Sequence, residues 1–344
     1  MIYLLAILTA LIPAIPLVQV SNSQLAKAQS YWLLALLSAG VCWLAWTEMW
    51  LALIGFAFLC RWRSASREQD VIKILGSVIK WVALGATWFL MLQIPRPLWE
   101  WVVVGWTLVA LQQVWLLVYR WHKIRVRMVG TLGSPVLTGL FLAAVFAIVH
   151  PFGWPLVGVG LFLTSSVAAG LAVSVSIIWL HPWTWPAFAG IGLVVTALWA
   201  LSPFLKGRRI GEWTLRGDTL DSWWARWYAW RITVHEFRQD RRQWLFGYGP
   251  GTVTPMLRRW AGRTNIELPH ETTCEVLHFV FEYGLVGGLA IGAFLWRVVP
   301  HLMVGDPWSA AWIGVVVMSF THWVCRHPVL GLLFLAISAR VVLG

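Results

Sequence analysis

The chain has 344 residues, of which 59% are hydrophobic and 12% charged, and its mean hydropathy is +0.72. Many apolar runs reach bilayer length, so the composition excludes an ordinary soluble domain and predicts an all-α, polytopic helical membrane protein. The formal charge of +12 would raise nucleic acid as a partner of a soluble chain. In a membrane protein the location of the charge matters more than its total, so we expect no nucleic-acid partner.

Ten apolar runs are candidate spans: 1–20, 31–60, 72–93, 98–119, 134–150, 155–180, 183–203, 271–299, 308–324 and 327–343. The first run lacks a basic start and a cleavage site, so it is expected to be a retained span. The runs 31–60 and 155–180 are long enough for two helices each, the second broken at Ser165 and Ser166. We therefore expect ten to twelve spans, arranged as N-terminal helices over 1–203, a large loop over 204–270, and C-terminal helices over 271–344.

Short basic loops predict the orientation of the chain. The intervals 61–73 and 120–127 each carry four Lys and Arg residues, and two spans separate them, so both are expected on the cytoplasmic side. Three further spans then place the 204–270 loop on the opposite face, outside the cytoplasm. If 155–180 is two helices, this count inverts.

The long loop concentrates positive charge. It holds eleven arginines and one lysine against six acids, which is half of the net charge of the chain. A loop of this length escapes the positive-inside rule, and guanidinium groups suit bidentate contacts to phosphate. The loop therefore predicts either an anionic substrate at the bilayer surface or a basic face that contacts lipid headgroups.

Two features of this loop are recognisable from residue spacing. The stretch 219–246 predicts an interfacial amphipathic helix, because Trp223, Trp227, Trp230, Val234 and Phe237 recur at helical spacing. It runs into GYGPG, in which Gly249 and Gly251 permit a tight turn around Pro250, with Gly247 at its start. Pro250 has no amide donor and the pattern is not a phosphate-binding loop, so a structural turn is expected.

Polar residues follow at the start of the next apolar run. His270 near the membrane edge could accept a proton from a sugar hydroxyl at neutral pH. An alternative is a zinc site, because His270, Cys274 and His278 share one helical face. HETTC differs from the zinc motif HExxH, however, and coordination across two helical turns is strained, so metal-independent chemistry is favoured.

The order of these motifs resembles the O-antigen ligase and polymerase superfamily. Arg226 is followed four residues later by Trp230, then come GYGPGT and a His at the start of a span that continues EYGLVG, and RVRMVGTLGSPVLTGLFL at 125–142 is also similar. The resemblance implies an inverting membrane glycosyltransferase without metal or cofactor, which moves a glycan from an undecaprenyl-diphosphate donor to an acceptor glycan, lipid or protein. By the same resemblance, Arg226 and Arg231 hold the diphosphate and His270 is the base.

The resemblance leaves alternatives open. The family histidine usually precedes Asn, whereas His270 precedes Glu271, and the spacing to EYG puts Thr273 at the expected position. Thr273 and His278 are therefore alternative bases. The family Arg after a Ser in an earlier span has no counterpart after Ser166. Alternative functions are a transporter or flippase of lipid-linked glycans, for which the basic loop is a docking surface, and a zinc-dependent intramembrane hydrolase.

Overall fold

The computed structural model describes residues 81, 84–121, 135–149, 154–164, 167–187, 189–190, 217–239, 243–264, 274–321, 324 and 327–344. All regular structure in these ranges is helical, which confirms the predicted helical class for this part of the chain. Two stretches are long and apolar enough to cross a membrane, Arg96–Tyr119 and Glu275–His301. The other described apolar helices are shorter than a bilayer-spanning length.

The helices are, in chain order, α5 Arg96–Trp121, α6 Pro135–Phe146, α7 Trp154–Thr164, α8 Val167–Leu180, η4 Pro182–Thr184, α11 Gly217–Gln239, α12 Val253–Thr264, α13 Glu275–Val298, η6 Val299–His301, α14 Pro307–Thr321 and α15 Pro328–Leu343. Proline lies in the first two positions of α5, α6, α7, α14 and α15. Proline fits there because the first helical amides have no intrahelical acceptor and its φ is already helical. Prolines in the sequence thus coincide with the starts of these five helices.

Several predicted spans correspond closely to helices, and one does not. The runs 98–119, 308–324 and 327–343 match α5, α14 and α15. The run 155–180 is two helices, α7 ending at Thr164 and α8 beginning at Val167. The orientation count treats this run as one span and inverts for two helices, so it no longer supports an extracytoplasmic 204–270 loop. The runs 1–20 and 31–60, and most of 183–203, lie outside the described residues.

Tryptophan builds much of the larger core, which is formed by α5 to α8, α13, α14 and α15. Trp88, Trp99 and Trp106 are almost completely buried, and Trp99 and Trp106 both pack against Trp308 of α14, with ring centroids 5.5 and 5.9 Å apart. The Arg340 guanidinium lies 5.6 Å from the Trp308 ring centroid. Several of the tryptophans thus pack helices together, while others, such as Trp296, are exposed.

Small residues let α14 approach α8 closely. A Cβ on Gly314 would lie 2.5 Å from Ser176 Oγ, so any side chain at this crossing would displace that hydroxyl. Ser176 Oγ donates to the carbonyl of Ala310 at 2.9 Å, which satisfies a fully buried hydroxyl. Close backbone approach with an interhelical hydrogen bond is typical of helix packing in apolar surroundings.

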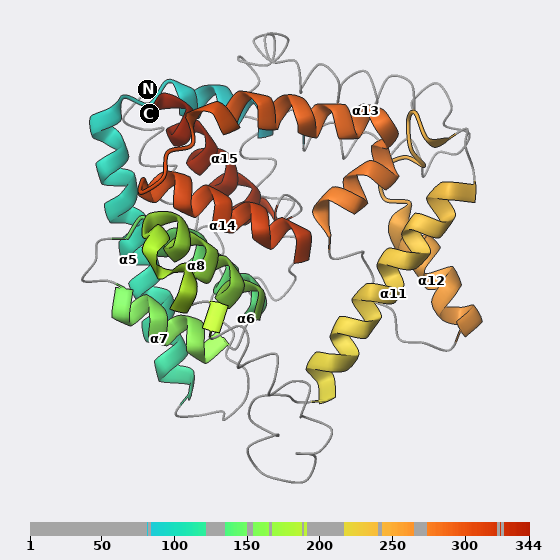
Figure 1. Cartoon of the computed structure of the whole chain (residues 1–344), viewed down its shortest axis with the longest axis horizontal. Coiled ribbons are helices and arrows are strands. Elements are labelled where there is room, and N and C mark those ends of the chain that lie inside the picture. Colours follow the sequence, from blue (N-terminus) through green and yellow to red (C-terminus); the bar gives the residue numbers. More distant parts are fainter. Residues whose placement is uncertain are drawn as a thin grey trace.

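A second, smaller core joins α11, α12 and α13. Its buried members come from all three helices: Ala229, Val253, Met256, Leu257 and Phe281. Figure 1 shows α11 and α12 together on one side of the molecule, with α13 extending from them to α14 and α15 on the other side. The helix α13 therefore connects α11 and α12 to the larger core.

Candidate functional site

The segment 244–251, called the docking segment below, contains the glycine turn and lies against the middle of α13. Four backbone hydrogen bonds join the two, all between 2.7 and 3.1 Å: Tyr248 N to Phe281 O, Gly249 N to Glu282 O, Leu285 N to Trp244 O and Val286 N to Leu245 O. These bonds cross the predicted domain boundary at residue 270. The turn before the span and the EYG sequence within the span therefore form one local structure.

The docking segment replaces helical hydrogen bonds that α13 lacks. In a regular helix the amides of Leu285 and Val286 would donate to the carbonyls of Phe281 and Glu282, four residues earlier. Gly284 interrupts the helix there, with φ 64° and ψ −152°. Each freed amide and each freed carbonyl instead finds a partner in the docking segment. Buried backbone groups are costly when unpaired, so the break in α13 and the docking segment stabilise each other.

Glycine is required on both sides of this contact. Gly247 has φ 70°, and a Cβ there would collide with the backbone carbonyl group of Glu282. A Cβ on Gly284 would lie 2.5 Å from Gly247 N. Gly249 and Gly251 also have positive φ, 96° and 74°. The structural turn predicted at Gly247, Gly249 and Gly251 is thus present, and it turns the chain onto α13.

A buried acid and a histidine reinforce the same contact. Glu282 Oε1 accepts the amide of Gly251 at 2.7 Å and lies 2.8 Å from His278 Nε2, one helical turn earlier on α13. Both side chains are only 4% exposed. A buried carboxylate needs such partners, because an unpaired charge in an apolar interior is costly. Glu282 therefore links Gly251, at the end of the docking segment, to α13.

The docking segment also contacts α11 and α12. The ring of Tyr248 stacks on Phe281 of α13 with centroids 4.5 Å apart, and its hydroxyl donates to the Glu236 carbonyl at 2.9 Å. Trp260 of α12 donates its Nε1 proton to Glu236 Oε1 at 2.7 Å. Through Tyr248 and Glu236, the docking segment is thereby connected to α11, α12 and α13.

The two predicted diphosphate ligands point to different sides of α11. Arg226 is half-buried and lies on the same helix face as Ala229 and Thr233, which are fully buried, and Ala229 belongs to the smaller core. Arg231 is exposed, and five residues along a helix correspond to a rotation of about 140°. The structure therefore separates Arg226 from Arg231, and Arg238 shares the exposed side with Arg231.

The helix around these arginines differs from its predicted extent. The predicted helix 219–246 ends at Gln239, and residues 243–246 form a turn that leads into the docking segment. Trp227 is exposed and Trp230 is half-buried, and the fully buried positions of this helix are Ala229 and Thr233. The helix α12 lies within the predicted loop and was not predicted.

His270, the predicted base, lies outside the described residues, as do Glu271 and Thr273. His278 is described, and its Nε2 faces Glu282. Cys274 directly precedes α13 and is half-buried. Within the described ranges, no three His, Cys, Asp or Glu side chains gather where they could hold a metal ion. The roles of His270 and Thr273 as bases stay predictions.

Three residues of this site were not singled out by the sequence analysis. Gly284 and Glu282 lie inside EYGLVG, and Phe281 precedes it. The spacing of His278 and Glu282, i and i+4 inside an apolar run, was a usable signal, since buried ionisable residues in spans are normally paired.

A comparison with protein-family models and with curated proteins gives no match to this chain.

Proposed function

We propose that this chain is an integral membrane glycosyltransferase, which transfers a glycan from a polyprenyl-diphosphate donor to an acceptor hydroxyl. The observation that carries the proposal is the contact between the docking segment and the break in α13. It brings GYGPG and EYG, two of the motif segments that resemble the O-antigen ligase and polymerase superfamily, into one hydrogen-bonded unit. The third segment, around Arg226, lies on the helix that packs on this unit through Ala229 and Phe281.

The chemistry that we propose uses charge from α11 and His270 as the proton acceptor. A diphosphate leaving group gains negative charge in the transition state, and a fixed guanidinium stabilises it. Arg226 is the first candidate, because its half-buried position on the packed face restricts its side chain. His270 is favoured over His278 as the base, because the Nε2 of His278 is already engaged by Glu282 in a buried pair. The proposed reaction uses no metal and no cofactor.

The proposed setting is a multi-pass protein of the inner membrane with ten to twelve spans. The family resemblance, rather than the count of basic loops, supports a 204–270 loop on the periplasmic side. Two apolar helices of spanning length support a membrane location. The basic loop supports an anionic, lipid-linked donor, because its arginines match phosphate oxygens in geometry as well as charge.

The test is glycan transfer by the purified full-length protein from an undecaprenyl-diphosphate-linked donor. Arg226→Ala is expected to lower kcat/KM roughly 10- to 150-fold, the usual loss for one hydrogen bond to a charged group. Arg238→Ala is the matched control, since it removes an exposed arginine from the same helix, and it should retain transfer. Arg231→Ala determines whether the diphosphate also reaches the exposed side of α11.

The base is tested in the same assay. His270→Ala should abolish most transfer while donor binding persists, whereas His270→Ala with full activity would exclude His270 and direct attention to Thr273. Donor binding without any transfer by the unchanged protein would contradict the enzyme proposal and favour the transporter alternative.

A further inference from the structure

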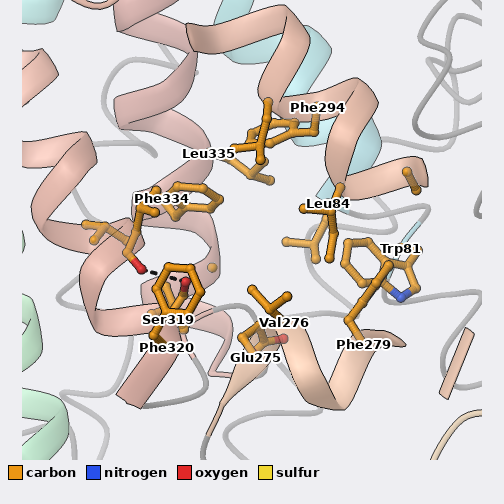
Figure 2. A pocket seen from close by; sticks show the side chains of 17 residues that line it. Trp81, Leu84, Glu275, Val276, Phe279, Phe294, Ser319, Phe320, Phe334 and Leu335 are labelled. Carbon is orange, nitrogen blue, oxygen red and sulfur yellow. Dashed lines mark hydrogen bonds between the residues drawn. The ribbon is translucent and has the colours of Figure 1, made fainter. Parts of the chain in front are cut away.

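An apolar cavity of about 160 Å³ lies between the two halves of α13 and the helices α14 and α15. Figure 2 shows Val276 and Phe279, from before the bend at Gly284, on one side, and Phe294, from after the bend, above them. Phe320 of α14 and Phe334 of α15 close the opposite wall. We propose that this cavity binds a segment of hydrocarbon chain from a membrane lipid.

The lining of the cavity is mostly apolar, which favours an apolar ligand over water. Glu275 and Ser319 are the polar side chains among the lining residues. Ser319 Oγ donates its proton to the Val316 carbonyl at 2.7 Å, so the hydroxyl proton is not offered to the cavity. A buried water needs two to four polar partners, and an apolar cavity of about 150 Å³ stays dry and binds benzene. A cavity of this size therefore holds a short length of hydrocarbon.

The position of the cavity favours a hydrocarbon chain that enters from the bilayer. Phe320 forms part of the wall and is also 52% exposed, so the wall is continuous with the outer surface. The outer side of α13 beyond the bend is strongly apolar, with Leu285, Leu289 and Trp296 more than half exposed. Such a surface faces hydrocarbon rather than water when the helix crosses a membrane. The guest can therefore enter from the lipid phase and leave the rest of its chain outside.

Because α13 bends at Gly284, residues from both of its halves line the cavity. Val276 and Phe279 come from before Gly284, and Ala290 and Phe294 come from after it. The four hydrogen bonds from the docking segment hold this bend. Binding of hydrocarbon is thus linked to the turn at 247–251, and the proposal does not depend on glycosyl transfer.

The experiment is photo-crosslinking of the full-length protein in nanodiscs, followed by mass spectrometry of the labelled peptides. One arm contains phosphatidylcholine with a diazirine in the middle of its acyl chain. The other contains a polyprenyl phosphate with a diazirine in its isoprenoid chain. Adducts on Phe279, Phe294 or Phe334 are expected in at least one arm, and the arm that labels them identifies the source of the chain.

Filling the cavity should remove these adducts. Ala290→Leu adds carbon to the cavity wall, and Val276→Phe does so from the other half of α13, which covers the case that one variant does not fold. Gly292→Leu is the matched control, because a Cβ there meets no atom within 4 Å on the exposed side of the same helix. Loss of cavity adducts in a folded filling variant, with adducts kept in the control, supports the site. Labelling confined to exposed residues such as Leu289, or unchanged by both filling variants, would overturn it.

Discussion

The substitution Gly284→Ala is the sharpest perturbation of the contact between the docking segment and α13. Its Cβ would lie 2.5 Å from Gly247 N and 2.6 Å from the Leu245 carbonyl, so the segment cannot remain in place. The backbone at φ 64° and ψ −152° is also a conformation that only glycine adopts readily. Alanine therefore favours a continuous α13 without the docked segment.

The size of the effect follows from the conformational cost at position 284, because the hydrogen-bond cost of undocking is the same with glycine and with alanine. Undocking loses four backbone bonds, but a continuous helix recovers two, so the net loss is two bonds, or about 1–3 kcal/mol. Holding alanine in the glycine conformation costs about 1–3 kcal/mol, and alanine gains about 1 kcal/mol over glycine in a regular helix. The equilibrium should therefore move toward the undocked state by about 2–4 kcal/mol, roughly 30- to 1000-fold.

Hydrogen exchange in detergent micelles measures this shift at the amides of Tyr248 and Gly249, which donate to α13 in the docked state. Gly284→Ala should accelerate their exchange by a large part of that factor. Gly288→Ala is the control, because its Cβ would make only an ordinary 3.9 Å contact with Val280 on the same helix. Equal exchange at both amides in the two variants would refute the reasoning, since the docking bonds would then not depend on the break.

Three further predictions follow from the same region. Glu282→Ala should lower the free energy of unfolding by about 2–5 kcal/mol, because the buried His278 ring and the Gly251 amide lose their acceptor. Glu282→Gln should lower it less. Thermal unfolding of the two variants in detergent measures the difference. Phe281→Ala should cost about 3–5 kcal/mol in the same measurement, through loss of the stacked contact with Tyr248 and the cavity that remains. Glycan transfer, if the proposed function holds, should keep its rate in a chelator such as EDTA, and a rate restored only by added zinc would contradict the metal-independent reaction.

Sequence patterns predicted the helices of the larger core well, because those patterns are local. Apolar runs bounded by proline define α5, α14 and α15, and proline determines a helix start from its own ring. The same reasoning located the division of 155–180 next to Ser165 and Ser166, although it could not decide between one helix and two. Here the residues that determine the structure are those inside the element itself.

The break in α13 could not be read from its own residues. Glycine is common in membrane helices, so Gly284 within EYGLVGG gives no separate signal. The break depends on acceptors and donors supplied by Trp244, Leu245 and the following turn, which are distant in sequence. For α12 the signal was present but unused, since Val253, Met256 and Leu257 have i, i+3 and i+4 spacing beside the basic pair Arg258 and Arg259.

The glycine turn itself is poorly suited to hold phosphate while it is docked. A glycine-rich loop binds phosphate through free backbone amides, and Pro250 has none. The amides of Tyr248 and Gly249 donate to α13 carbonyls, and that of Gly251 donates to Glu282. An anion at these amides would have to displace the docking segment, so added pyrophosphate should leave their hydrogen exchange unchanged. Accelerated exchange on addition of pyrophosphate would show that the turn binds the anion. If exchange stays unchanged, the proposed recognition of a diphosphate depends on side chains, and the turn fixes the bend of α13 beside α11.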